Sequence, residues 1–291
     1  MKMPFLLPHV LAIATTAVCI CVPSSAQTPG YHLELTEGTR GRVILVNDSA
    51  KPIEAFFLWQ QCGTALGMSI HDTQRPSGSA YSPDIQDILS DGGDRMGVWS
   101  ADGRNVKQAE VIAPGQRFIT LTSLASDPES MKCELQIIAA VFTDGSFEGD
   151  DQALSSIQAR REGIATGVRY WMAKLNPESG EMPEPEAILS DAESRSHADQ
   201  QELQTIGGPV IKVVFTPAYN YWMGRSQVDD WVAGDLKDQS QRQDPTKALK
   251  SMARWLDHWQ KKFDGDIAMK KLAAAFPLPD GIVPPDPQPA P

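Results

Sequence analysis

The sequence is poor in cysteine and lacks the short motifs that bind nucleotides or metals. It has four cysteines in 291 residues, and only Cys62 and Cys133 lie beyond residue 26. No G-x-G-x-x-G stretch, no P-loop and no H-E-x-x-H pair occurs. We therefore expect neither a cofactor nor a metal, and the sequence does not indicate a dinucleotide enzyme, a P-loop NTPase or a zincin protease.

Positive charge and long apolar runs are also scarce. Lysine and arginine number 26 against 37 acidic residues, which gives a net charge of −11. An acidic chain is repelled by phosphate backbones, so a nucleic acid is not expected as a partner. Beyond residue 26, no apolar run is long enough to cross a membrane, so we expect no span after removal of the leader.

The N-terminus has the pattern of a secretory signal peptide. Lys2 precedes an apolar run from Phe5 to Val22, and the small residues Ser24-Ser25-Ala26 follow. We predict that residues 1–26 are cleaved and that the protein is periplasmic or extracellular. An uncleaved anchor is the alternative. Because exported proteins meet an oxidising environment, the pattern also predicts a Cys62–Cys133 disulfide, with two separate buried thiols as the alternative.

Residues 27–150 read as a series of short strands. Apolar and polar residues alternate from Tyr31 to Thr36, and turn residues recur at intervals of about ten along the segment. The pattern predicts an antiparallel, immunoglobulin-like β-sandwich as an N-terminal domain, within an α+β protein. The irregular stretch at 63–95 is a long loop of the kind that carries binding sites.

Residues 151–276 change to a helical period. Apolar residues step by threes and fours from Leu154 to Leu175, and Arg161 is the one polar residue in that stripe. Asp150 and Asp151 lie where negative charge suits a helix dipole. The pattern predicts a C-terminal helical region, with further helices at 185–203, 228–236, after Asp244, and at 267–276. Residues 277–291 are Pro-rich and predicted to be disordered.

Two stretches are candidates for chemistry. The loop Asp144–Asp150 resembles a calcium loop in its first positions, but Ser155 stands where the bidentate glutamate belongs, so we interpret it as a turn that leads into a helix. The second is a cluster of aromatic residues that could stack on a glycan or an envelope protein, although such rings also build helical cores. Its members are Tyr219, Tyr221, Trp222 and Trp231.

Three stretches together resemble a known family. They are Val46–Ala55, Ala113-Pro114-Gly115 and Ala140–Asp150, followed by a helix with Arg160-Arg161. The chain over about residues 40–165 resembles uncharacterised secreted proteins that are common in soil acidobacteria. The resemblance implies a shared fold but no activity, because its motifs are turns and strand ends.

These observations favour a non-enzymatic binding or envelope-associated module. The alternative is a secreted hydrolase of unknown substrate, with its site in the 63–95 loop or at the seam between the strands and the helices. An apolar groove with a convergent acid, base and nucleophile would favour the hydrolase.

Overall fold

The computed structural model describes nine stretches of the chain. They are residues 30–36, 42–64, 77–81, 97–99, 111–121, 131–176, 182–207, 216–240 and 244–282. The expected signal peptide, most of the 63–95 loop and the end of the Pro-rich tail lie outside the described residues. The same holds for residues 208–215.

The described strands form two antiparallel sheets of four strands each, ordered β1-β2-β6-β5 and β4-β3-β7-β8. The central strands β3 and β7 of the second sheet are the longest, with twelve residues each. The bounds are β1 Tyr31–Thr36, β2 Arg42–Asn47, β3 Ile53–Thr64, β4 Ser77–Tyr81, β5 Gly97–Trp99, β6 Arg117–Leu121, β7 Met131–Phe142 and β8 Phe147–Gly149.

The central part of the second sheet is buried on both faces. Phe56 on β3 packs with Leu45 and Phe118 of the first sheet, and its ring meets that of Phe118 edge-on, with centroids 5.4 Å apart. The next residue, Phe57, points to the opposite face and packs with Leu154 of a helix. Because neighbouring side chains in a strand point to opposite faces, this burial explains why β3 is apolar at successive positions.

Five helices follow the strands in the described residues. They are α2 Asp151–Leu175, α3 Pro185–Gly207, α4 Pro217–Ser240, α5 Pro245–Gly265 and α6 Ile267–Ala275. Three of them start at an aspartate whose carboxylate accepts a backbone N–H of the first turn, as N-caps do. Asp150 caps α2, Asp244 caps α5 and Asp266 caps α6.

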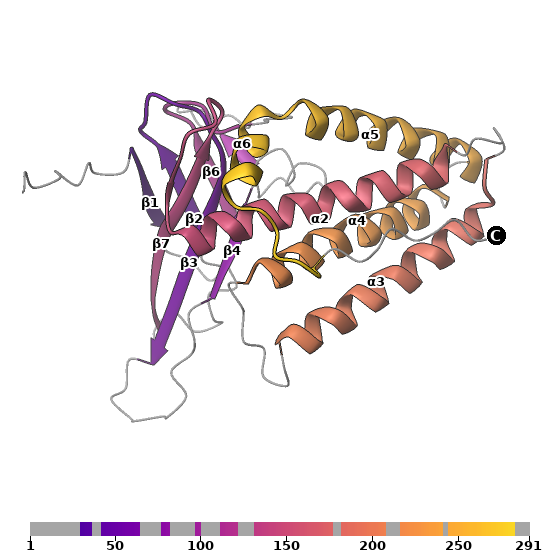
Figure 1. Ribbon diagram of the computed structural model, residues 1–291, viewed down its shortest axis with the longest axis horizontal. Helices are drawn as coiled ribbons and strands as arrows, with labels where there is room; N and C mark the ends of the chain where they lie inside the picture. The colour runs from indigo at the N-terminus through magenta and orange to yellow at the C-terminus, as the bar shows by residue number, and fades with distance from the viewer. Residues whose placement is uncertain are drawn as a thin grey trace, which may run out of the picture.

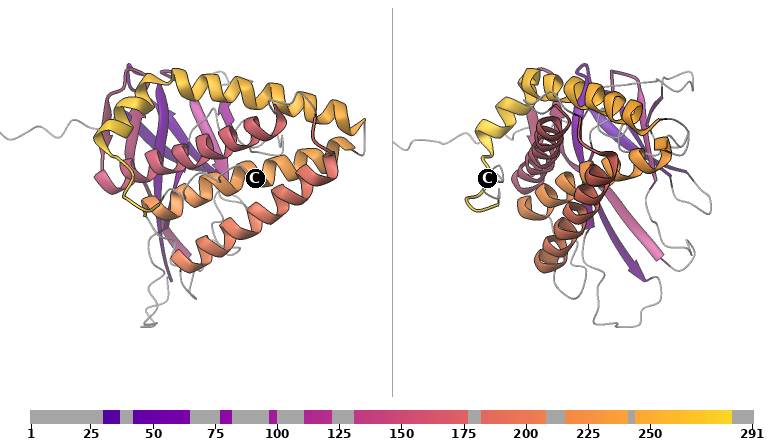
Figure 2. Two further views of the ribbon diagram at one scale, coloured as in Figure 1. Left: turned by 45° about the vertical axis from the view of Figure 1, so that its right-hand side comes forward. Right: turned by 90° about the vertical axis from the view of Figure 1, so that its right-hand side faces the viewer.

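The helices form a layer on the second sheet and extend beyond it (Figures 1 and 2). The start of α2 and the whole of α6 pack on the sheet through Leu154, Ile157 and Leu272. The rest of α2 packs with α3, α4 and α5 around Trp171 and Leu249. The apolar stripe of α2 therefore buries against the sheet at one end and against helices at the other.

Helices α2 and α4 approach each other closely at glycines. A Cβ at Gly163 would lie 2.0 Å from the carbonyl oxygen of Tyr221, and one at Gly224 would lie 2.2 Å from that of Arg160. Any larger residue at either position would force the two backbones apart, so these glycines set the spacing of the two helices.

The structure contradicts the predicted immunoglobulin-like sandwich. Helices are the major secondary structure of the described residues, and most strands are short. Moreover, α2 and α6 cover the outer face of the second sheet, which would face solvent in an immunoglobulin-like domain. The prediction was wrong because short strands and regular turns indicate antiparallel pairing, but do not indicate what covers each face.

The helix predictions fared better. Those for α2, α5 and α6 are confirmed, and α3 is only slightly longer than predicted. Helix α4, expected at 228–236, spans Pro217–Ser240. Its first half contacts α2 on one side and α3 on the other, so its residues do not form one apolar stripe and the helical period is weak.

Candidate ligand pocket between sheet and helices

The three stretches that carry the family resemblance meet at one corner of the sheets. Asn47, fully buried at the end of β2, donates its side-chain N–H to Lys51 O at 2.9 Å and to Ile112 O at 2.6 Å. Its Oδ1 accepts from the N–H of Ser49 at 3.0 Å, and Gly115 N–H donates to its backbone carbonyl at 2.7 Å. One asparagine thus ties the turn after β2 to the segment before β6.

The third stretch joins the same corner through Lys51. Its ammonium donates to Ser146 Oγ at 2.9 Å and lies 2.7 Å from Asp144 Oδ2, while Thr143 N–H donates to Pro52 O at 3.2 Å. Hydrogen bonds from Lys51 and Ser146 hold the pKa of the exposed Asp144 carboxyl well below its usual range. The turn after β7 is therefore held against the turn before β3.

A buried charge cluster lies beside this corner, where the sheet meets the helices. We call Glu54 of β3, Arg161 of α2 and Asp266 between α5 and α6 the seam cluster. Arg161 Nη2 hydrogen-bonds to Asp266 Oδ2 and lies 3.6 Å from Glu54 Oε1. The side chains of Arg161 and Asp266 are each only 5% exposed and that of Glu54 is 11% exposed. The Arg161 guanidinium also lies 5.1 Å from the centroid of the Phe263 ring.

The seam cluster has two carboxyl groups but one guanidinium. Burial by itself would raise the pKa of Asp266, but the charge of Arg161 and hydrogen bonds from Glu54 and from Met269 N–H outweigh burial and lower that pKa. Arg161 thus favours the ionised form of Asp266 in a site where burial alone would favour the neutral acid.

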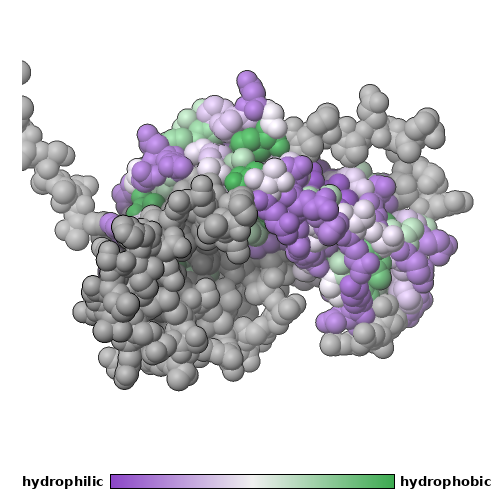
Figure 3. All heavy atoms as spheres, turned by 90° about the horizontal axis from the view of Figure 1, so that it is seen from below, coloured by the Kyte–Doolittle hydropathy of each residue, from purple (hydrophilic) through white to green (hydrophobic). Residues whose placement is uncertain are grey.

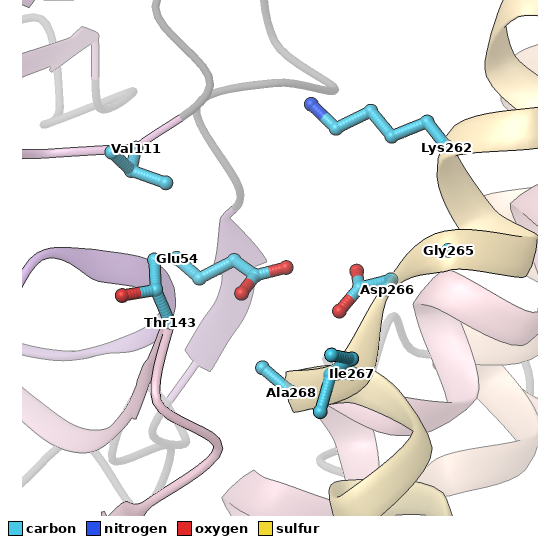
Figure 4. Close-up of a pocket in the computed structure, with 8 residues that line it drawn as sticks. All are labelled: Glu54, Val111, Thr143, Lys262, Gly265, Asp266, Ile267 and Ala268. Atoms are coloured by element: carbon cyan, nitrogen blue, oxygen red, sulfur yellow. The ribbon is translucent and has the colours of Figure 1, made fainter.

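The seam cluster forms part of the wall of a pocket of about 320 Å³ (Figure 4). The sheet corner contributes one side of the pocket and the α5–α6 junction contributes the other. Ile267 at the mouth is 66% exposed, although it is a large apolar residue. The lining residues are Glu54, Val111, Thr143, Lys262, Gly265, Asp266, Ile267 and Ala268.

A second group of buried charges lies inside the helical layer, and we call it the bundle cluster. It consists of two Asp–Arg pairs between α3 and α4. Arg225 donates to Asp199 through two nitrogens, with Nε to Oδ2 at 2.8 Å. Arg195 Nε lies 3.3 Å from Asp229 Oδ1, which also accepts from Trp171 Nε1 at 2.6 Å. The carboxylates of both aspartates are fully buried.

The second carboxylate oxygen of Asp229 has no hydrogen-bond partner among the described residues. Burial raises the pKa of Asp229 to about 6, although the charge of Arg195 and the Trp171 hydrogen bond both favour the ionised form. Each pair of the bundle cluster joins one positive and one negative charge, but the Asp229 carboxylate lacks a hydrogen bond at one of its two oxygens.

The predicted aromatic binding residues lie in α4, within the helical layer. Tyr221 is fully buried and is not available to a partner. The other three, Tyr219, Trp222 and Trp231, are partly buried. The Arg225 guanidinium stacks 4.2 Å from the centroid of the Trp222 ring, and Trp231 packs against the helical core. The structure does not bring these rings together with the pocket.

The two cysteines predicted to pair are opposite each other in the β3–β7 ladder, where Cys62 is the register partner of Cys133. Directly opposed residues of antiparallel strands have Cα atoms about 4.5–5.5 Å apart, which is within the range that a disulfide spans. The register therefore supports the disulfide, which stays a prediction.

In the Asp144–Asp150 loop, the oxygens face neighbouring donors. Asp144 accepts from Lys51 and Ser146, and Asp150 accepts from Ala153 N–H as the cap of α2. Gly145 has a φ of 78°, as the turn requires. Within the described residues, no group of three His, Cys, Asp or Glu side chains is placed to hold a metal ion.

Sequence reasoning missed all three members of the seam cluster as site residues. Two had a signal. Glu54 is a carboxylate within the apolar run of β3, and Arg161 is the polar residue in the apolar stripe of α2. Buried charges are costly unless paired, so a charge at a predicted core position indicates an unseen partner. Asp266 gave no such signal, because an aspartate between two helices is ordinary capping chemistry.

No known family matches the chain, and comparison with curated proteins and with solved structures finds no match in either. None of the helices in the described residues combines the length and the apolar character needed to cross a membrane.

Proposed function

We propose that this protein is an exported, non-enzymatic binding module, and that it takes its ligand in the pocket between the sheet corner and the α5–α6 junction. The observation that carries the proposal is the seam cluster beside this pocket. A buried ion group often stabilises a fold less than apolar residues of the same volume would. Its position in a pocket wall, and not within a sealed core, supports a role in recognition.

The rigidity of the pocket supports the same proposal. The Asn47 hydrogen bonds fix the corner that carries Glu54, Val111 and Thr143. On the other side, the N-terminus of α6 fixes Asp266 through the hydrogen bond from Met269 N–H at 2.9 Å. A pocket whose walls are held before the ligand arrives loses less entropy on binding.

The test uses a pocket-filling variant. Ile267→Trp should place an indole in the mouth of the pocket, whereas Ala274→Trp places it on the same face of α6, about 10 Å away. Ligand-observed NMR with a library of small fragments should detect compounds that bind the wild type and Ala274→Trp but not Ile267→Trp. If no fragment binds, or if Ile267→Trp binds them equally well, the proposal is wrong.

A hydrolase at the seam is the second candidate, favoured by the two acids Glu54 and Asp266 that lie against one guanidinium in the pocket wall. Against it, both oxygens of Asp266 are engaged, Oδ1 by Met269 N–H and Oδ2 by Arg161. The same NMR samples discriminate the two functions, because new signals from a cleaved fragment that grow with time would favour the hydrolase.

An envelope protein or a glycan as partner of the aromatic stretch stays a hypothesis, now limited to Tyr219, Trp222 and Trp231. Trp231→Ala tested for capture of purified peptidoglycan fragments, beside wild type, would examine it. Equal capture by the two proteins would remove Trp231 from consideration.

A further inference from the structure

Helix α5 carries a row of positive charge in an acidic protein. Residues 244–276 contain seven lysines and arginines against four aspartates, although the whole chain has a net charge of −11. Along α5, cations and one histidine recur at intervals of three and four positions, which places them on one face of the helix. We call these residues the α5 row, and all of them are exposed: Lys247, Lys250, Arg254, His258 and Lys261.

The α5 row faces away from the rest of the protein. On the opposite face of the helix, Leu249, Met252 and Leu256 are buried in the helical core. Helix α5 runs along one edge of the helical layer in Figure 1 and in both views of Figure 2. At a rise of 1.5 Å per residue, the row is about 20 Å long. It therefore forms a straight strip of exposed positive charge.

Most of the charge in the α5 row is not neutralised by neighbours. Lys261 pairs with Asp257, with Nζ 2.7 Å from Oδ2. In the part of the chain that the structure describes, Lys247, Lys250 and Arg254 have no acidic side chain at ion-pair distance. Salt at physiological strength limits the reach of a charge to about 8 Å, so acidic residues farther away than this do not cancel the row.

An exposed tryptophan lies beside the α5 row. Trp255 is 46% exposed, and it shares with Ile267 the property of being a large hydrophobic residue left in solvent. Its ring meets that of His258 edge-on, with centroids 6.3 Å apart. Trp255 does not line the pocket, so the pocket does not explain its exposure. Proteins that bind a membrane surface place such rings, beside lysines and arginines, at the level of the lipid headgroups.

The shape and chemistry of the row favour a lipid surface over a nucleic acid or a second copy of the chain. A flat array of lipid phosphates can contact the whole row while the indole enters the boundary with the acyl chains. A single ring is no platform for successive bases. Figure 3 shows the side opposite α5, where the described residues that are hydrophobic gather only in small groups, so this view offers no broad apolar surface to Trp255 of another copy.

We infer that α5 docks the protein on a membrane of anionic phospholipid, with the cations of the α5 row at the lipid phosphates and Trp255 among the headgroups. The docking is reversible, because a few cations and one indole attach a protein far more weakly than a spanning helix does. The surface is separate from the pocket, so this inference goes beyond the proposed function and does not depend on it.

Flotation of the exported, purified protein with lipid vesicles tests the inference. One set of vesicles contains phosphatidylglycerol and phosphatidylcholine in equal parts, and the other contains phosphatidylcholine alone. We expect the protein to float with the anionic vesicles only, and to be released by high salt, because salt screens the attraction between the row and the phosphates. Equal binding to both sets, or no binding to the anionic set, would overturn the inference.

Two double variants distinguish the row from net charge. Lys250→Gln with Arg254→Gln should weaken binding to the anionic vesicles about fivefold for each cation removed, or roughly 25-fold together. Arg169→Gln with Lys174→Gln removes the same charge from exposed positions of α2 and should bind as the wild type does. Thermal unfolding shows that each variant is folded. Equal losses in the two double variants would mean that net charge, and not the α5 row, governs binding.

Tryptophan fluorescence tests the position of Trp255. Lipids brominated in their acyl chains should quench the wild type, and Trp255→Phe should remove this quenching while keeping most of the binding, because phenylalanine is also apolar. Quenching that persists in Trp255→Phe would refute the placement. Tighter binding of a double-stranded DNA oligonucleotide than of anionic vesicles would also overturn the inference, as would a dimer that Arg254→Gln abolishes.

Discussion

The seam cluster and the bundle cluster differ in how their buried acids are paired with arginines. In the bundle, Asp199 and Asp229 each have an arginine across the α3–α4 contact, and both carboxylates are fully buried. At the seam, Arg161 serves two acids, and the group borders a pocket. Each aspartate of the bundle cluster therefore has its own arginine, whereas the two acids of the seam cluster share Arg161 in the wall of a pocket.

This difference indicates which charges hold the fold and which can serve a ligand. A buried ion pair away from any pocket can only stabilise the fold or specify its packing. Charged side chains in the wall of a pocket can in addition contact a ligand. The comparison predicts that changes in the bundle cluster alter stability strongly, and that a conservative change in the seam cluster alters binding more than stability.

The largest effect should come from breaking a bundle pair. Arg225→Met leaves the fully buried carboxylate of Asp199 without its cation, which should cost about 3–5 kcal/mol of unfolding free energy. Arg169→Met is the control, because Arg169 pairs with Glu162 at the surface, where such a pair contributes less than about 1 kcal/mol. Urea denaturation measures both. Equal midpoints for the two variants would mean that the bundle pair is not structural.

Reduction of the predicted Cys62–Cys133 disulfide should come next. Closing a loop of about 70 residues stabilises by about 4 kcal/mol on the chain-entropy model. Because the two cysteines are paired in the β3–β7 ladder that carries Glu54, reduction should loosen the seam cluster before the bundle. Hydrogen exchange with and without reductant measures this order. Two free thiols in protein purified from the periplasm would refute the disulfide.

Neutralising Asp229 should stabilise the protein at neutral pH. The pKa of Asp229 rises from 3.8 to about 6 on folding, so its contribution to stability is lost as pH rises between these values and stays lost above them. Asp229→Asn keeps an acceptor for Trp171 and removes the charge, so we expect a gain of about 1–3 kcal/mol at pH 7. Near pH 4 the two proteins should unfold at the same denaturant concentration. A loss of stability at pH 7 would show that the Arg195 pair outweighs burial.

The smallest effect on stability should come from Glu54→Gln at the seam. The glutamine amide keeps an oxygen that can accept from Arg161 and gains an N–H that can donate to Asp266. Arg161 keeps its hydrogen bond to Asp266, so the loss should stay below about 1 kcal/mol. Thermal unfolding at pH 7 measures it. A loss as large as that of Arg225→Met would remove the distinction between the two clusters.

Much of the local structure could be predicted from the sequence. The spacing of apolar residues from Leu154 to Leu175 predicted α2. Asp150 and Asp151 marked where the helix begins, and Asp150 is its N-cap. The Cys62 and Cys133 strands were identified as well, although the sandwich built from them was wrong. Helix α4 was underestimated, because contacts on two sides hide the helical period that a one-sided helix displays.

The sequence by itself determined the features that depend on near neighbours in the chain. Helical period, capping aspartates and the turn at Gly145 follow from hydrogen bonds and backbone sterics within a few residues. Only the tertiary structure decided that Arg161 of α2 meets Glu54 of β3 and Asp266, because residues so far apart in sequence are brought together by packing of the sheet against α2 and α6. The apolar stripe of α2 singled out Arg161 as a polar residue at a core position. Its partners and the pocket beside them are known only from the tertiary structure.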